Sequence, residues 1–144
     1  MNELVRLLHE GRARERAQAA FYRRLSGAAD DAGDAARAEV LNELLADEQH
    51  HVSRLTARLL ELGERPDDAR PPAEDPPGLE GWEEAGRLRE AAEVAWYEDA
   101  LERITDGATR AILEEILASE RHHHANLGGK WMPAGPTGQT GESE

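Results

Sequence analysis

The chain has no cysteine, few aromatic residues and no long apolar segment. Without cysteine its 144 residues can form no disulfide, thiolate zinc site or iron–sulfur cluster, so a hydrophobic core has to hold the fold. No apolar run approaches the roughly 20 residues that a membrane-spanning helix needs, and the start of the chain is charged from its third residue onward. We therefore expect a cytoplasmic protein with no membrane partner.

Basic side chains are scarce relative to acidic ones. Seventeen Lys and Arg against thirty Asp and Glu give a net charge of −13 with His neutral. Such a charge repels nucleic acid, because binding to its phosphates depends on Lys and Arg contacts. We expect no nucleic acid partner, and the charge favours cations instead.

Apolar residues recur at spacings of three and four in four segments, which is typical of amphipathic helices. We predict helices at about 2–26, from about 35 to 62, at 82–106 and at 109–127, with a glycine-rich reversal at 27–34. The segment 63–81 holds five of the seven prolines and predicts an extended crossover, long enough for the third helix to run parallel to the second. Residues 128–144 are rich in Gly, Pro and Thr and predict a flexible tail.

An internal repeat relates the two halves of the chain. Residues 41–51 (LNELLADEQHH) and 113–123 (LEEILASERHH) are identical at seven of eleven positions, and 15–22 (ERAQAAFY) aligns with 90–97 (EAAEVAWY). The chain is therefore two similar helical hairpins. Because one hairpin cannot bury its apolar stripe alone, the repeat predicts an all-α domain over residues 1–127, a four-helix bundle with approximate twofold symmetry.

Charged residues interrupt the apolar stripes at matching positions in both hairpins. Two helices carry a Glu-x-x-His pair on one turn, and the other two carry glutamates at the same level of the bundle. The candidates are Glu15, Glu48, His51, Glu90, Glu93, Glu120 and His123. Alignment of the repeats favours Glu90 as the counterpart of Glu15, whereas the distance from the predicted turn slightly favours Glu93. Since burying unpaired carboxylates is costly, their convergence predicts a metal site.

These motifs resemble the di-iron sites of the ferritin-like superfamily, nearest to rubrerythrin-type and bacterioferritin-type domains. The resemblance implies two iron ions, or manganese or zinc, with Glu48 and Glu120 bridging the two. It implies an oxidoreductase that oxidises Fe(II) with O₂ or reduces peroxide, a ferroxidase or a peroxidase. An external electron donor would be needed, because a chain without cysteine has no rubredoxin iron. Tyr22 and Tyr97 are candidates for hydrogen bonds to the ligating carboxylates.

Other interpretations remain open at this point. The same residues would also suit a carrier or sensor that holds Fe, Mn or Zn without turnover. Alternatively, the bundle is a structural or cargo protein with a vestigial site. Gln49 stands where bacterioferritins have a haem-ligating Met, which argues against a haem-binding storage shell. A homodimer is compatible with the sequence.

Overall fold

The computed structural model describes residues 2–71 and 78–127. Within them the chain forms four α-helices, a short 3-10 helix and no strand, so the prediction of an all-α four-helix bundle is confirmed. The elements are α1 (Glu3–Asp31), α2 (Ala35–Glu61), η1 (Leu79–Gly81), α3 (Trp82–Arg103) and α4 (Gly107–Asn126). The predicted tail at 128–144 and the middle of the predicted crossover, residues 72–77, lie outside the described residues.

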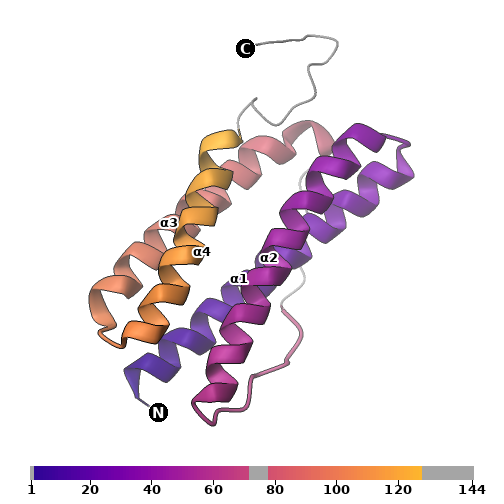
Figure 1. Ribbon diagram of the computed structural model, residues 1–144. Coiled ribbons are helices and arrows are strands. Elements are labelled where there is room, and N and C mark those ends of the chain that lie inside the picture. Colours follow the sequence, from indigo (N-terminus) through magenta and orange to yellow (C-terminus); the bar gives the residue numbers. More distant parts are fainter. Residues whose placement is uncertain (1, 72–77, 128–144) are drawn as a thin grey trace.

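The four helices form two antiparallel hairpins that lie side by side (Figure 1). One hairpin is α1 with α2 and the other is α3 with α4; between hairpins, α1 contacts α3 and α2 contacts α4. Helix α3 runs in the same direction as α2, which is the direction that the sequence predicted. This arrangement brings the repeated segments of α2 and α4 next to each other.

The turn between α1 and α2 is shorter than the sequence predicts. The predicted helix ends near residue 26, but α1 continues to Asp31. The extension includes Gly27, and a glycine inside a helix costs ~1 kcal/mol. The packing of Ala29, which is fully buried in the core, outweighs this cost. The reversal is confined to the residues after Asp31, where Gly33 has a φ of +72° and Asp34 caps α2.

The turn between α3 and α4 lies earlier in the chain than predicted. Helix α3 ends at Arg103, and α4 begins at Gly107, which the sequence assigns to the turn. The cause is Asp106, whose carboxylate accepts a hydrogen bond from the backbone N–H of Thr109 at 3.0 Å and so caps α4. Arg58 of α2 donates to the same carboxylate at 2.9 Å, which ties this turn to the other hairpin.

Two apolar clusters fill the two ends of the bundle, and a polar layer separates them. The cluster at the α3–α4 turn contains Val5, Leu7, Leu8, Leu55, Leu59, Tyr97, Ala100, Ile104, Leu113, Ile116 and Leu117. The cluster at the α1–α2 turn contains Phe21, Tyr22, Leu25, Ala29, Ala38, Leu41, Leu44, Trp82 and Leu127. Between these clusters, the buried positions of α2 and α4 are Glu and His, and those of α1 and α3 include glutamates.

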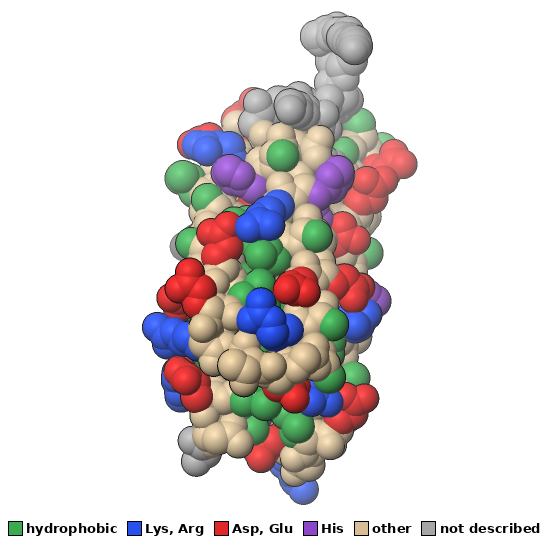
Figure 2. Space-filling view, turned by 60° about the vertical axis from the view of Figure 1, so that its left-hand side comes forward, with side chains coloured by type: hydrophobic (Ala, Val, Ile, Leu, Met, Phe, Trp, Pro, Cys, Tyr) green, Lys and Arg blue, Asp and Glu red, His purple; other side chains and the backbone are tan. Residues whose placement is uncertain are grey.

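The surface carries charges of both signs. On the face drawn in Figure 2, acidic and basic side chains are interspersed. Many pair along one helix or across helices, as Arg121 does with Glu98 at 2.7 Å. None of the described helices has the length and apolar character needed to cross a lipid bilayer.

Candidate metal centre

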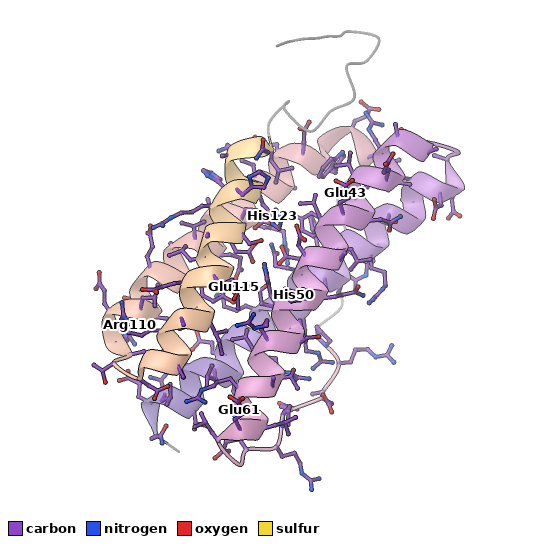
Figure 3. The ribbon with its side chains drawn as sticks, viewed as in Figure 1. Glu43, His50, Glu61, Arg110, Glu115 and His123 are labelled. Carbon is purple, nitrogen blue, oxygen red and sulfur yellow. The ribbon has the colours of Figure 1, made fainter. Side chains whose placement is uncertain are left out.

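Six of the seven candidate residues form one buried cluster in the middle layer of the bundle. Each helix contributes: α1 and α3 one glutamate each, α2 and α4 a Glu-x-x-His pair each. His51 is 4% exposed and the other five side chains are 0% exposed. The six are Glu15, Glu48, His51, Glu90, Glu120 and His123. Figure 3 labels His123 on α4 and, on α2, His50, which directly precedes His51.

The cluster consists of two overlapping groups that could each hold a metal ion. One group is Glu15, Glu48, His51 and Glu120, and the other is Glu48, Glu90, Glu120 and His123. Within each group the candidate ligand atoms lie within 4.8 Å of one another. Glu48 and Glu120 belong to both groups, so the two positions share a pair of carboxylates.

Both histidines turn the same ring nitrogen toward the carboxylates. Nδ1 of His51 lies 3.1 Å from Oε1 of Glu48 and 3.3 Å from Oε1 of Glu15. Nδ1 of His123 lies 3.1 Å from Oε1 of Glu120. The ring centroids of the two histidines are 6.5 Å apart. Each group therefore offers one imidazole nitrogen together with carboxylate oxygens, a donor set that suits iron, manganese or zinc.

Each tyrosine binds the glutamate of the opposite hairpin. The hydroxyl of Tyr22 on α1 donates to Oε2 of Glu90 on α3 at 2.7 Å, and that of Tyr97 on α3 donates to Oε2 of Glu15 on α1 at 2.5 Å. Burial, reinforced by the negative charge of these glutamates, raises the pKa of both phenols well above its usual range. Both hydroxyls therefore stay protonated and keep donating, which orients the two carboxylates.

Three buried carboxylate oxygens of the cluster have no hydrogen-bond partner among the described residues. They are Oε2 of Glu48, Oε1 of Glu90 and Oε2 of Glu120. Buried oxygens without a hydrogen bond are costly, and buried polar groups in proteins nearly always have one. Cations within the two groups would satisfy these oxygens, so the cluster fits metal ions.

Two glutamates of the cluster are held ionised without metal. Burial alone would raise the pKa of Glu15, but hydrogen bonds with His51 and other neighbours lower it to about 2. Burial would also raise the pKa of Glu90, but the ring of His123, 3.7 Å from its carboxylate, and other neighbours bring this pKa below its usual range. These are also the two carboxylates that accept the tyrosine hydroxyls.

The two shared glutamates behave in the opposite way. Burial, together with the charges of Glu15 and Glu120, raises the pKa of Glu48 well above its usual value. Burial likewise raises the pKa of Glu120, to about 8. Both shared carboxyl groups are therefore protonated at neutral pH in the absence of metal.

Both histidines are cationic in the metal-free cluster. Burial alone would lower the pKa of His51, but the nearby carboxylates of Glu120 and Glu15, 3.5 Å and 3.3 Å from its Nδ1, raise it to about 10. The pKa of His123 is also raised, because hydrogen bonds to Asp47 and Glu120 outweigh burial. The positive charges of the two histidines cancel the negative charges of Glu15 and Glu90, so the metal-free layer is neutral. If two divalent ions replaced the protons, their four positive charges would balance all four glutamates.

Glu93 lies outside both groups. Its carboxylate accepts two hydrogen bonds from the guanidinium of Arg14, each 3.1 Å long. Burial raises the pKa of Glu93 to about 7 despite this ion pair. The turn-based preference for Glu93 over Glu90 follows from the late position predicted for the α3–α4 turn. With the turn ending at Asp106, the level of the cluster on α3 falls at Glu90.

The sequence interpretation missed three neighbours of the cluster. Gln18 is buried and donates to Oε2 of Glu90 at 3.3 Å, Arg14 binds Glu93, and Asp47 accepts a hydrogen bond from Nε2 of His123 at 2.8 Å. Gln18 follows Glu15 by one turn on the inward stripe, and that spacing was a usable signal. Arg14 and Asp47 lie off the stripe, so periodicity does not identify them.

The comparisons with known proteins add no relative. No protein-family model matches the chain, and no curated protein matches it. The fold and the cluster together define a four-helix bundle with a buried carboxylate–histidine site that could bind metal.

Proposed function

We propose that this protein is a di-metal carboxylate protein of the ferritin-like type, related to rubrerythrin and bacterioferritin domains, that binds two iron ions and acts as an oxidoreductase. The observation that carries the proposal is the pair of overlapping groups, each with three glutamates and one histidine, that share Glu48 and Glu120. The three buried carboxylate oxygens without a hydrogen-bond partner support it independently.

The proposed ligands follow from the two groups. Glu15 and His51 would complete one position, and Glu90 and His123 the other, while Glu48 and Glu120 would serve both. Manganese or zinc would find the same donors, because the affinity order of divalent metals does not by itself select iron.

The surrounding residues would prepare this site for redox chemistry. Two bound Fe(II) ions would supply two electrons, enough to reduce one peroxide to water or one O₂ to peroxide. The tyrosine hydroxyls hold Glu15 and Glu90, so these carboxylates would keep their orientation as charge in the layer changes. The apolar clusters on both sides keep bulk water from the layer. Reducing equivalents would come from an external donor.

The first experiment is metal loading under anaerobic conditions. The protein is mixed with Fe(II), desalted and subjected to elemental analysis, with the expected result of two irons per chain. The double variant Glu48→Gln/Glu120→Gln should retain no iron. The matched control, Glu114→Gln/Glu115→Gln, makes the same two substitutions at exposed positions of α4 and should retain two. Iron content that is equal in both variants would disprove the site.

The second experiment separates the activities. Peroxide, and in a parallel sample air, is added to the iron-loaded protein, and the ferric absorption is followed with time. Faster oxidation by peroxide would support a peroxidase, and faster oxidation by O₂ a ferroxidase. Two retained metal ions with no oxidation by either reagent would instead identify a carrier or sensor.

A further inference from the structure

The two histidines of the cluster differ in what their outer ring nitrogens contact. Nε2 of His123 lies 2.8 Å from Oδ2 of Asp47, which reaches it from α2 across the gap between the hairpins. His123 is fully buried, whereas the side chain of Asp47 is 52% exposed. For His51, no hydrogen bond of Nε2 exists among the described residues.

The internal repeat explains this difference. Alignment of 41–51 with 113–123 matches Asp47 with Ser119, each directly before a shared glutamate. Ser119 therefore stands on α4 at the position that Asp47 occupies on α2, and no hydrogen bond joins it to His51 among the described residues. A serine is shorter than an aspartate and carries no charge, so the exchange removes the carboxylate partner from one side only.

A carboxylate behind a ligating imidazole has a defined effect. When it accepts the N–H of one ring nitrogen, the other nitrogen keeps its lone pair directed at the metal and becomes a stronger donor. In this cluster the inward nitrogen is Nδ1 in both histidines, so Nε2 is the nitrogen available for such a partner.

The inference rests on the di-metal site proposed above. We propose that Asp47 positions His123 and makes the metal position beside His123 bind its ion more tightly than the position beside His51. Glu93 does not change this comparison, because Arg14 binds its carboxylate and it belongs to neither group. The two ions would therefore bind in order, first beside His123 and then beside His51.

Titration of the metal-free protein with Zn²⁺, followed by calorimetry, tests the order directly. The wild-type chain should bind two ions in two steps of unequal affinity. Asp47→Ser copies the residue of the other repeat and should weaken the tighter step by about 10- to 100-fold while leaving the other step unchanged. Asp47→Asn keeps an acceptor oxygen and should lose less affinity than Asp47→Ser.

Glu43→Ser is the matched control. Glu43 is an exposed carboxylate one turn before Asp47 on α2 and makes no ion pair within the described residues, so its replacement removes the same charge without touching His123 (Figure 3). Both binding steps should stay as in the wild type. An equal effect of Glu43→Ser and Asp47→Ser would show that general electrostatic attraction, and not the hydrogen bond, sets the affinity.

A spectroscopic readout separates positioning from a loss of structure. In the Zn²⁺-loaded protein, the Nε2–H proton of His123 should give a protected downfield NMR signal that Asp47→Ser removes, while the signals of His51 stay. If the wild type binds fewer than two Zn²⁺, the di-metal site itself is wrong. If it binds two with equal affinity, or if Asp47→Ser leaves the tighter step unchanged, the site stands and the role of Asp47 is overturned.

Discussion

The hydroxyl of Tyr97 donates a 2.5 Å hydrogen bond to the buried carboxylate of Glu15, which belongs to the other hairpin. Tyr22 and Glu90 repeat this contact with the hairpins exchanged. The ring contacts are repeated too, because Tyr97 packs edge-on against Trp96 at 4.9 Å and Tyr22 against Phe21 at 5.2 Å. The internal repeat is thus expressed in contacts that join the hairpins as well as in their helices.

Removal of one of these hydroxyls should destabilise the metal-free protein. Tyr97→Phe leaves the ring packing in place but takes the donor from an ionised, fully buried carboxylate. We expect a loss of about 2 kcal/mol in the free energy of unfolding, the range for hydrogen bonds to charged groups. Chemical denaturation checks this value. In a double-mutant cycle with Glu15→Gln, most of the loss should appear as coupling energy, and additive effects would refute the assignment.

The burial of Glu93 should make the stability of the metal-free protein depend on pH. In the fold the pKa of Glu93 is raised to about 7, mainly by burial, from an ordinary 4.5. Between pH 4.5 and 7, Glu93 therefore keeps its proton in the folded state, whereas it has lost this proton in the unfolded chain. The contribution of Glu93 to the free energy of unfolding is complete below pH 4.5 and is lost as the pH rises through 7. Because one unit of pKa shift corresponds to 1.36 kcal/mol, the loss amounts to about 3 kcal/mol.

Glu93→Gln tests this dependence, because glutamine resembles the protonated acid at every pH. Denaturation of metal-free wild type and variant should give stabilities that diverge as the pH rises from 4.5 to 8, with the variant the more stable at the upper end. Glu98→Gln, at an exposed position of α3, is the control and should shift the curve by less than ~1 kcal/mol at all pH values. Parallel curves for wild type and Glu93→Gln would contradict the raised pKa.

The sequence alone predicts some of the site residues but not the ends of the turns. The Glu-x-x-His pairs and Glu15 could be identified because they interrupt apolar stripes at positions that the repeat duplicates. The ends of the turns could not, because they depend on the burial of Ala29 and on the cap formed by Asp106, which exist only after packing. The choice between Glu90 and Glu93 depended on that second turn.

Contacts between side chains of the two hairpins could not be predicted from the sequence either. Asp47 contacts His123 and Arg14 contacts Glu93 because each helix is oriented about its own axis so that these side chains face the other hairpin. Periodicity identifies which face of a helix is buried, but it does not assign partners to the residues at the edge of that face. The repeat nevertheless indicates where to look, since Arg14 corresponds to Arg89, which donates to Gln18 at 2.6 Å.

The two shared glutamates should oppose folding once they lose their protons. Glu120 has a pKa of about 8 in the fold, so its contribution to stability is complete below pH 4.5 and is lost as the pH rises through 8. Glu120→Gln should leave the metal-free protein more stable than the wild type at pH 9, as measured by thermal unfolding, and close to it at pH 4. A variant less stable than the wild type at pH 9 would show that Glu120 contributes packing or hydrogen bonds that outweigh its charge.

Metal binding should release protons, because ions and protons neutralise the same layer. In the metal-free cluster at pH 7, four groups carry a proton that a bound ion would displace: Glu48, Glu120 and the two histidines. We therefore expect about four protons released as two Zn²⁺ ions bind at pH 7. Calorimetry in buffers of different ionisation enthalpy counts them, since the apparent binding enthalpy varies linearly with that of the buffer. Binding to exposed carboxylates, which are already ionised at this pH, would release almost none, so a slope near zero would place the metal outside the buried cluster.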